Sequence, residues 1–257
     1  MKFAILLLGW SFALHAQLAA PNPSGVTMGH VHLYSKDPEE QKKFWVGALD
    51  AQETKLGALQ VFKLPGVLVF LQKADAREGS QGSIINHLGV KVHDLAATLA
   101  KLESANIPIV SRTPPQAMVL APDDIRVELT EDPSISEATI NHHIHFYATD
   151  VAAMQKWYAT TFGAIPGKRG KFDAADLPGV NLTFTPFAAA QAPTKGRALD
   201  HIGFEIRDLE AFTKKLEASG VKFDVSYRKI PALGISLAFL TDPWGTYIEL
   251  TEGLNKL

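Results

Sequence analysis

A segment with a histidine seven residues before an aspartate occurs four times in this chain of 257 residues. The four copies are His30 to Asp37, His87 to Asp94, His143 to Asp150 and His201 to Asp208. In each copy, the apolar residues around the histidine predict a strand, and the aspartate predicts the N-cap of a following helix. A unit of this size cannot cover the apolar face of its own sheet, so the copies must pair to form a core.

The spacing of the copies indicates an internal duplication. His30 and His143 are 113 residues apart, and the motif Leu-Pro-Gly-Val at Leu64 recurs with the same offset at Leu177. Each helix is followed by further short apolar runs separated by turn residues. The order of a strand, a helix and then three strands therefore predicts an α+β fold of four βαβββ modules, nested as a repeat within a repeat.

We expect two domains, at residues 26–132 and 140–254, with the polar segment 133–139 as the linker between them. The hydrophobic fraction of 46% and the charged fraction of 20% are typical of a globular protein. The formal net charge of −2 excludes the basic footprint of a nucleic-acid-binding protein or of a protein that binds anionic membranes. The absence of cysteine excludes disulfides and thiolate ligands.

Residues 1–20 predict a cleavable secretory signal peptide. Met1-Lys2 is a minimal positive start, Phe3 to Leu14 is almost entirely apolar, and Ala16 and Ala20 both offer a cleavage site. The apolar run is short for a membrane span, which favours cleavage over a retained anchor. We therefore expect a secreted or periplasmic protein with no stable membrane association after signal cleavage.

Each half of the chain carries two histidines and one strand glutamate that together predict a metal site. The sets are His30, His87 and Glu128 in the first half, and His143, His201 and Glu249 in the second. A carboxylate among apolar strand residues costs several kcal/mol to bury, roughly, unless a cation compensates it. A single such histidine is more often a hydrogen-bonded sheet residue, but six residues repeated in register favour metal. Two imidazoles and one carboxylate suit Fe(II) best, with Mn(II), Ni(II) or Zn(II) as alternatives.

The grouping of these ligands depends on how the modules pair. Pairing of neighbours groups the ligands as they occur in each half. Crossed pairing instead groups His30 and His201 with Glu249, and it groups His87 and His143 with Glu128. We expect pairing of neighbours, because short connections usually join adjacent elements and the linker is long enough to separate two halves. The set of six ligands is the same in both arrangements.

The last module resembles the vicinal oxygen chelate superfamily. The resemblance rests on two motifs, Asp-His-Ile at Asp200 and Leu-Thr-Asp-Pro-Trp-Gly-Thr-Tyr-Ile-Glu-Leu from Leu240 to Leu250. This group includes glyoxalases, extradiol dioxygenases, certain epimerases, and the bleomycin and fosfomycin resistance proteins. The resemblance extends over essentially the whole mature chain. It implies two U-shaped mixed-sheet half-barrels with helices outside, and a metal bound in each cavity by the first-strand histidines and the last-strand glutamates.

The chain departs from this family pattern at several positions. Phe70 and Thr183 occupy the places of the additional carboxylates of glyoxalases, which leaves three ligands per site, as in extradiol dioxygenases. Phe239 stands where those dioxygenases have a tyrosine. His32 and His145, two residues beyond a ligand and on the same strand face, are candidates for the acid or base, and packing is the equal alternative for both.

These observations predict an exported metal-dependent enzyme that chelates two neighbouring oxygens of a small substrate, with dioxygenase-like or lyase/isomerase-like chemistry. An exported protein would rarely meet glutathione, which argues against glutathione-dependent chemistry. Fe(II) oxidises readily outside the cytosol, which argues more weakly against an iron enzyme. The alternative is a protein that sequesters a small molecule without catalysis, as the resistance proteins do; an inert structural relic is a third hypothesis. We expect a monomer or a homodimer.

Overall fold

The computed structural model describes residues 18–257. Residues 1–17, and with them most of the predicted signal peptide, lie outside the described residues. Within 18–257, no helix is both long and apolar enough to cross a membrane.

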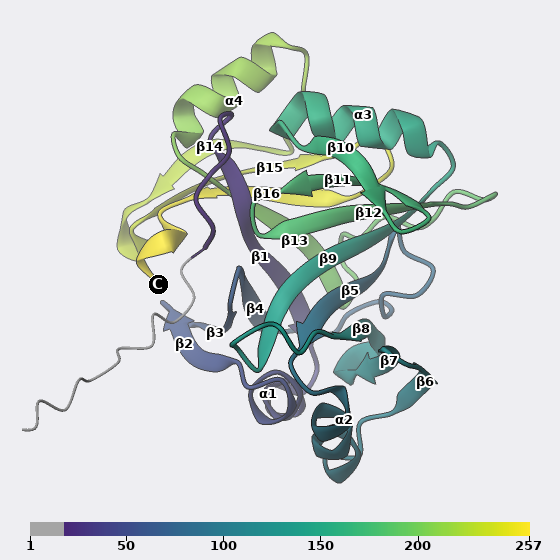
Figure 1. Cartoon of the computed structure of the whole chain (residues 1–257). Helices are drawn as coiled ribbons and strands as arrows, with labels where there is room; N and C mark the ends of the chain where they lie inside the picture. Colours follow the sequence, from purple (N-terminus) through teal and green to yellow (C-terminus); the bar gives the residue numbers. More distant parts are fainter. Residues whose placement is uncertain (1–17) are drawn as a thin grey trace, which may run out of the picture.

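Two eight-stranded mixed sheets form the fold (Figure 1). The first sheet has the spatial order β14 (Val225–Ile230), β15 (Ile235–Thr241), β16 (Tyr247–Glu252), β13 (Leu199–Ile206), β1 (Val26–Ser35), β4 (Val67–Lys73), β3 (Leu59–Leu64) and β2 (Gln52–Leu56). The second sheet has the order β10 (Ile165–Arg169), β11 (Phe172–Leu177), β12 (Val180–Pro186), β9 (Thr139–Ala148), β5 (Ile85–Val92), β8 (Ile125–Glu131), β7 (Gln116–Ala121) and β6 (Ile109–Thr113). Neither sheet closes, which confirms the predicted α+β half-barrels.

One helical segment follows the first strand of each module. They are α1 (Pro38–Lys42), which continues into the π-helical turn η1 (Lys43–Ala48), α2 (Leu95–Ser104), α3 (Val151–Phe162) and α4 (Leu209–Ala218). Short 3₁₀ turns are η2 (Pro122–Asp124), η3 (Pro231–Leu233) and η4 (Leu254–Lys256). The four predicted N-caps are confirmed: the side chains of Asp37, Asp94, Asp150 and Asp208 each accept a hydrogen bond from a backbone N–H of the first helical turn.

The modules pair in the crossed arrangement, so our expectation that neighbours pair was wrong. Module one (β1–β4) shares a sheet with module four (β13–β16), and module two (β5–β8) shares one with module three (β9–β12). The physical reason lies in the connections. Only residues 132–138 join modules two and three, whereas the longer segments 74–84 and 187–198 join the modules within each half. The shortest connection thus keeps its modules in one sheet, and the longer ones cross between sheets.

The duplicated Pro-Gly turns hold the two sheets together. The backbone N–H of Asn141 donates to the carbonyl of Pro65 (3.0 Å), and that of Met28 donates to the carbonyl of Pro178 (2.9 Å). Each turn is thereby hydrogen-bonded to a strand of the other sheet, namely the first strand of module three or of module one. The apolar faces of all four modules contribute to one large buried cluster, and the helices cover the outside of the sheets (Figure 1).

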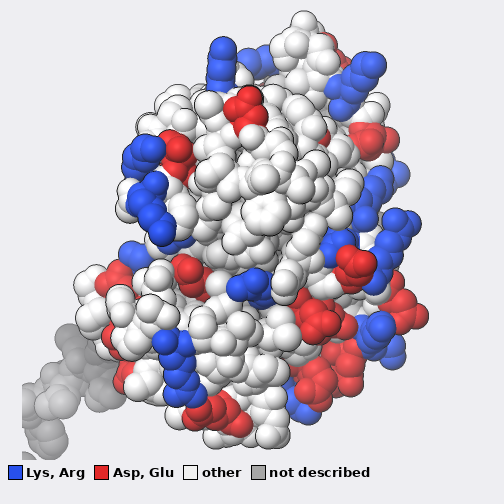
Figure 2. Space-filling model, turned by 90° about the vertical axis from the view of Figure 1, so that its right-hand side faces the viewer, with Lys and Arg blue, Asp and Glu red and all other residues white. Residues whose placement is uncertain are grey.

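On the face shown in Figure 2, basic and acidic side chains alternate around a largely uncharged centre. This mixed distribution agrees with the small net charge of −2. No broad basic area is visible on this face.

Candidate metal centres

The register of the central strands brings the predicted ligands onto the concave face of each sheet. In the first sheet, β1 and β13 are antiparallel, with His30 opposite Gly203 and His32 opposite His201. On the other side of β13, Glu249 of β16 is level with Gly203. Because side chains alternate along a strand, these residues point to the same face.

The first centre consists of His30, His201 and Glu249. Oε2 of Glu249 lies 2.9 Å from Nε2 of His30 and 3.0 Å from Nε2 of His201. All three side chains are buried, and one ligand atom from each lies within 4.8 Å of the others. Ligand atoms of one small divalent cation are separated by about 3 Å, given metal–ligand distances of about 2.1 Å. The donor set and its spacing therefore fit a divalent metal.

Gly203 provides the room for this convergence. A Cβ atom at that position would lie 2.0 Å from Cε1 and 2.4 Å from Nε2 of the His30 imidazole. The missing side chain lets the His30 ring lie across β13 and reach Glu249 on the next strand. Gly89 has the same role in the second sheet, where a Cβ would lie 1.9 Å from Cε1 of His143. The sequence carried this signal as a glycine two residues after the first-strand histidine of modules two and four.

Asp200 orients His201. Its Oδ1 lies 2.6 Å from Nδ1 of His201, and its Oδ2 accepts a hydrogen bond from the backbone N–H of Gly196. A carboxylate on the far nitrogen of a ligand histidine is a common support for metal binding, because it fixes the ring and leaves Nε2 for the metal. We did not predict this residue from the sequence, although it directly precedes His201.

The protonation states at the first centre suit a cation. Burial lowers the pKa of His30, so its imidazole is neutral at neutral pH. Burial also raises the pKa of Glu249, but hydrogen bonds with His201 and His30 outweigh that effect and hold its pKa well below the usual range. Burial opposes protonation of His201 as well, yet its contacts with Asp200 and Glu249 raise its pKa. The two carboxylates beside the His201 ring favour a positive charge there, and a metal ion at Nε2 would supply that charge in place of a proton.

The second centre differs in how it holds its glutamate. Nε2 of His87 and Nε2 of His143 are 3.3 Å apart, and His145 completes a buried group of three imidazoles. Glu128 lies farther away, with its oxygens 3.8 Å from Nε2 of His87 and 3.6 Å from Nε2 of His143. Asn86 here takes the place of Asp200, with its Oδ1 2.9 Å from Nδ1 of His87.

A guanidinium group lies beside the second-centre carboxylate. Arg169 of β10 places NH1 3.7 Å from Oε1 of Glu128, and its Nε donates to Oγ1 of Thr183 (2.8 Å). The side-chain amide of Gln116 also donates to Oε1 of Glu128 (3.0 Å). Arg169 and the amide of Gln116 thus already contact Glu128, although burial outweighs them and raises the pKa of this carboxyl. Among residues 18–257, Glu249 pairs with the two histidines and with no lysine or arginine. The sequence pattern did not reveal Arg169, because it comes from a different module.

The strand register confirms the predicted equivalence of Phe70 and Thr183 to the two glutamates. Glu249 and Glu128 are each level with the residue two places after the first-strand histidine, which is Gly203 or Gly89. Phe70 and Thr183 are level with the same positions of their modules, His32 and His145. The Phe70 ring stacks on the His30 imidazole, with 4.6 Å between ring centroids. The first centre therefore has an apolar wall where a fourth ligand would stand.

His32 and His145 have the positions that we predicted, beside the ligands on the same faces. Nε2 of His32 is buried without a hydrogen-bond partner among the described residues, and burial lowers the pKa of this group to about 3. The His32 ring lies 4.6 Å from that of His201. His145 differs, because its Nε2 lies 2.7 Å from Oγ1 of Thr185. Only its Nδ1 is without a partner in the described part of the chain.

A cavity of about 770 Å³ opens above the first centre. His32, His201 and Glu249 line it from the side of the predicted metal, and Tyr34 and Tyr247 contribute aromatic walls that we did not predict from sequence. Burial raises the pKa of Tyr247 to about 12, so its hydroxyl remains protonated. This volume is in the range of small-molecule binding sites.

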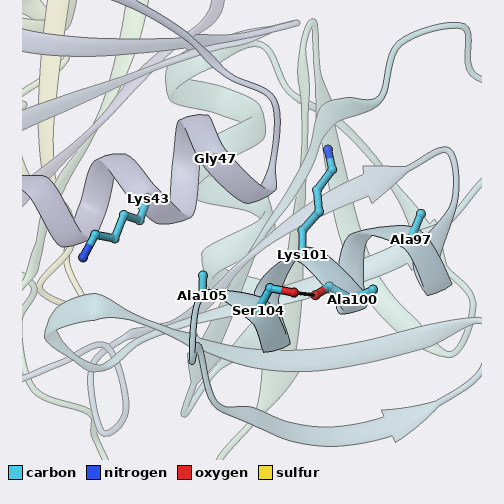
Figure 3. A pocket seen from close by; sticks show the side chains of 7 residues that line it. All are labelled: Lys43, Gly47, Ala97, Ala100, Lys101, Ser104 and Ala105. Carbon is cyan, nitrogen blue, oxygen red and sulfur yellow. Dashed lines mark hydrogen bonds between the residues drawn. The ribbon is translucent and has the colours of Figure 1, made fainter.

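A different hollow, of about 530 Å³, lies between η1 and α2 (Figure 3). Small side chains and two lysines form it: Lys43, Gly47, Ala97, Ala100, Lys101, Ser104 and Ala105. Oγ of Ser104 donates to the carbonyl of Ala100 (2.9 Å), and the amines of Lys43 and Lys101 pair with Glu40 and Asp50. The lining contains no histidine or carboxylate, so it is separate from both centres.

The buried neutral histidines predict a pH-dependent stability of the metal-free protein. The folded-state pKa is about 3 for His32 and about 2 for His87, both below the unfolded value of 6.5. As pH falls below about 6.5, the unfolded chain binds protons that the folded state excludes, so the free energy of unfolding decreases. Each such histidine contributes about 1.4 kcal/mol per pH unit. Urea unfolding in EDTA at pH 7.5 and 5.5 measures this slope.

The matched variants are His32→Gln and, for the exposed His93, His93→Gln. We expect His32→Gln to reduce the slope and His93→Gln to leave it unchanged. A slope that is the same in all three proteins would contradict this assignment.

Comparisons with known proteins agree with this geometry. The sequence model of the Glyoxalase/Bleomycin resistance protein/Dioxygenase superfamily matches residues 27–133 and 139–250. The structure is similar to that of glyoxalase I from Zea mays, with 15% identity, a TM-score of 0.68, and coverage of 90% of this chain and 94% of that one. A proposed dioxygenase from Bacillus subtilis subsp. subtilis str. 168 gives 15% identity and a TM-score of 0.67, with 92% and 86% covered. At such identities, the likeness shows the fold alone. No curated protein sequence gives a significant match.

Proposed function

Since this chain belongs to the Glyoxalase/Bleomycin resistance protein/Dioxygenase superfamily, we propose that it is a metal-dependent enzyme with its active centre at His30, His201 and Glu249. The observation that carries the proposal is the carboxylate of Glu249. It is buried between two imidazole nitrogens at 2.9 and 3.0 Å, below a cavity of substrate size. A divalent cation, with Fe(II) as the best match to this donor set, would supply a Lewis acid for two adjacent oxygens of a small substrate.

The residues of the chain prepare this centre for one task. Glu249 and His30 are held in their unprotonated forms, and Asp200 holds the His201 ring in place. Phe70 closes the position of a fourth protein ligand, so the open side faces the cavity. Oxygen atoms of a substrate would enter from that side, where the rings of Tyr247 and Phe239 stack with 5.0 Å between their centroids and form one wall.

His32 is the residue that we assign to proton transfer. Its buried Nε2 has no partner among residues 18–257, it lines the cavity, and its neutral form can accept a proton or hydrogen bond from a substrate hydroxyl. A developing anion beside it would raise its pKa from the resting value. We expect His32→Gln to retain metal and to lose turnover.

Metal content and turnover test the proposal together. We expect about one divalent metal per chain by elemental analysis of protein purified without oxygen, with Fe(II), Mn(II), Ni(II) and Zn(II) compared after reloading. Oxygen uptake with dihydroxybenzenes tests the dioxygenase-like reaction. Exchange of the α-proton of 2-hydroxyketones in D₂O tests the lyase/isomerase-like reaction, because that reaction and the proton exchange would need the same enediolate. Protein that neither binds a divalent metal nor turns over any such compound would refute the assignment.

The aromatic lining of the cavity also supports a second candidate, a protein that sequesters a small molecule without catalysis. Tyr34, Phe70 and Phe239 could hold an aromatic ligand without a metal. Tight binding of an aromatic compound by metal-free protein, without conversion after metal is added, would favour this candidate.

The guanidinium of Arg169 leads us to expect that the second centre does not bind metal in the wild-type protein. Replacing it in Arg169→Met would leave Glu128 beside His87 and His143 with uncharged hydrogen-bond partners such as the amide of Gln116. We expect metal binding to rise from about one to nearly two equivalents of Zn(II) per chain, measured after equilibrium dialysis. Lys168→Met, on the same strand with its amine paired to Asp173, is the matched control and should leave one equivalent. A wild-type protein that already binds two equivalents would contradict this role of Arg169.

We also propose export with removal of the N-terminal segment, on the basis of its charge and hydropathy pattern. Leu18 packs against the small apolar cluster that includes Leu254. Cleavage after Ala16 would retain that contact, and cleavage after Ala20 would remove it. The N-terminal mass of protein recovered from the periplasm or medium decides between the two sites, and an intact Met1 there would refute cleavage.

A further inference from the structure

The cavity above the first centre carries a set of cations that the metal chemistry does not use. Arg77, Lys195 and Arg228 all line it. They come from three separate parts of the chain: the segment after β4, the segment before β13, and strand β14. In a chain with a formal net charge of −2, the meeting of three cations around one cavity runs against the overall composition.

None of these three side chains has a carboxylate within ion-pair distance among the described residues. The acidic groups that line the same cavity are Asp200 and Glu249. Asp200 contacts His201 and the backbone of Gly196, and Glu249 contacts His30 and His201. The carboxylates therefore face the metal centre, while the cations keep their charge uncompensated within the described part of the chain.

Arg77 and Lys195 are held next to each other by the backbone. The N–H of Arg77 donates to the carbonyl of Gly196 (3.0 Å), and the N–H of Ala198 donates to the carbonyl of Glu78 (2.8 Å). The Arg77 side chain lies against Gly196, where a Cβ would be 3.4 Å from its Nε. Nζ of Lys195 lies 4.2 Å from the centre of the Tyr247 ring, which itself lines the cavity. Both charges are thus located at one side of the opening.

The remaining wall is apolar. Leu56, Leu59 and Leu233 line the cavity together with the aromatic rings already described. A ligand that fills it would contact oxygen-binding groups at one end, an apolar surface along its length, and cations at the rim. Solvated lysines and arginines on a protein surface are common, but three of them around one concave apolar site create a positive potential that attracts an anionic ligand.

We propose that the substrate carries an oxyanionic group, a carboxylate or a phosphate, on an apolar body at the end remote from its two chelating oxygens, and that Arg77, Lys195 and Arg228 bind that group. This inference rests on the proposed metal function of the same site. The guanidinium groups of Arg77 and Arg228 can each make a bidentate contact, and Lys195 adds a point charge. These residues are specificity determinants and do not take part in the reaction at the metal.

The test uses two pairs of probes that differ in charge. The first pair is 4-carboxybenzohydroxamate and 4-methylbenzohydroxamate, bound to the Zn(II)-loaded protein and measured by calorimetry. Both probes offer two adjacent oxygens, but only one has an anionic far end. We expect the carboxylate probe to bind at least about tenfold more tightly at low salt, and the advantage to shrink in 0.5 M NaCl.

The variant Arg77→Gln/Lys195→Gln should abolish this advantage and leave binding of the methyl probe within about twofold of wild type. The control Lys36→Gln/Lys222→Gln removes two exposed charges that do not line the cavity and should retain the advantage. Equal binding of the two probes to wild-type protein would overturn the inference and leave the metal function intact.

The second pair, 4-tert-butylbenzoate and 4-tert-butylbenzyl alcohol, is applied to metal-free protein and separates the two hypotheses. If no metal binds but the benzoate is still preferred, with loss in the double variant, the proposed metal function fails and the anion site stands. If the benzoate is not preferred by either the metal-free or the Zn(II)-loaded protein, the anion site fails.

Discussion

Glu249→Gln is expected to remove the metal from the protein. The substitution keeps the shape of the side chain but replaces the buried carboxylate oxygen that lies 2.9 Å from His30 and 3.0 Å from His201 with a neutral amide. Without the negative charge, two imidazoles are left to bind the cation, so we expect its affinity to fall by at least about 100-fold, more than for loss of a supporting residue. Elemental analysis after dialysis should show less than about a tenth of an equivalent, and turnover should fall in parallel.

The matched control is Glu128→Gln, the same change at the equivalent strand position of the other sheet. We expect it to leave the metal content and turnover of the first centre unchanged, because Glu128 belongs to the second centre beside Arg169. Circular dichroism of both variants in EDTA checks that the fold is retained. Normal metal content in Glu249→Gln, or metal loss in Glu128→Gln, would show that the first centre is wrongly assigned.

Gly203→Ala is expected to abolish metal binding through sterics alone. The added methyl group would lie 2.0 Å from Cε1 and 2.2 Å from Nδ1 of His30, far inside van der Waals contact. The imidazole must leave its position, and it then no longer meets Glu249. We expect about a 100-fold or greater loss of Zn(II) affinity, measured by competition with a chelator, and destabilisation of the metal-free protein by about 1–3 kcal/mol.

Two glycine variants distinguish this effect from general damage. Gly47→Ala adds a methyl group in η1 where nothing lies within 4 Å, so it should leave metal binding unchanged and stabilise the protein by about 0.5–1 kcal/mol. Gly89→Ala should displace His143 in the second centre, destabilise the fold to a similar degree, and leave the metal of the first centre in place. Equal metal loss in Gly89→Ala and Gly203→Ala would mean that the effect comes from lost stability and not from the His30 contact.

The local features of this fold could be predicted from the sequence because their causes are local. The N-cap aspartates, the helices that follow them and the strand alternation depend on residues within one turn or one strand. The six candidate ligand positions followed from the same alternation, because it places the histidine and glutamate side chains on one face of their strands. The places of Phe70 and Thr183 were predicted for the same reason, and the strand register confirms them.

The pairing of the modules was misjudged, although the sequence held part of the answer. The segment 133–139 was treated as a separator because it is polar. It is in fact the shortest connection between modules, and short connections keep elements in one sheet. Comparing the lengths of the three connections would have favoured the crossed arrangement.

By itself, the sequence determined a duplicated βαβββ chain with histidines and glutamates on the inner strand faces. Only the tertiary structure decided that His30 meets His201 and Glu249, that Arg169 lies against Glu128, and that Arg77, Lys195 and Arg228 surround one cavity. These contacts join residues far apart in the chain, from different modules. Their formation depends on strand register and on the choice of partner sheet, which no local pattern of residues specifies.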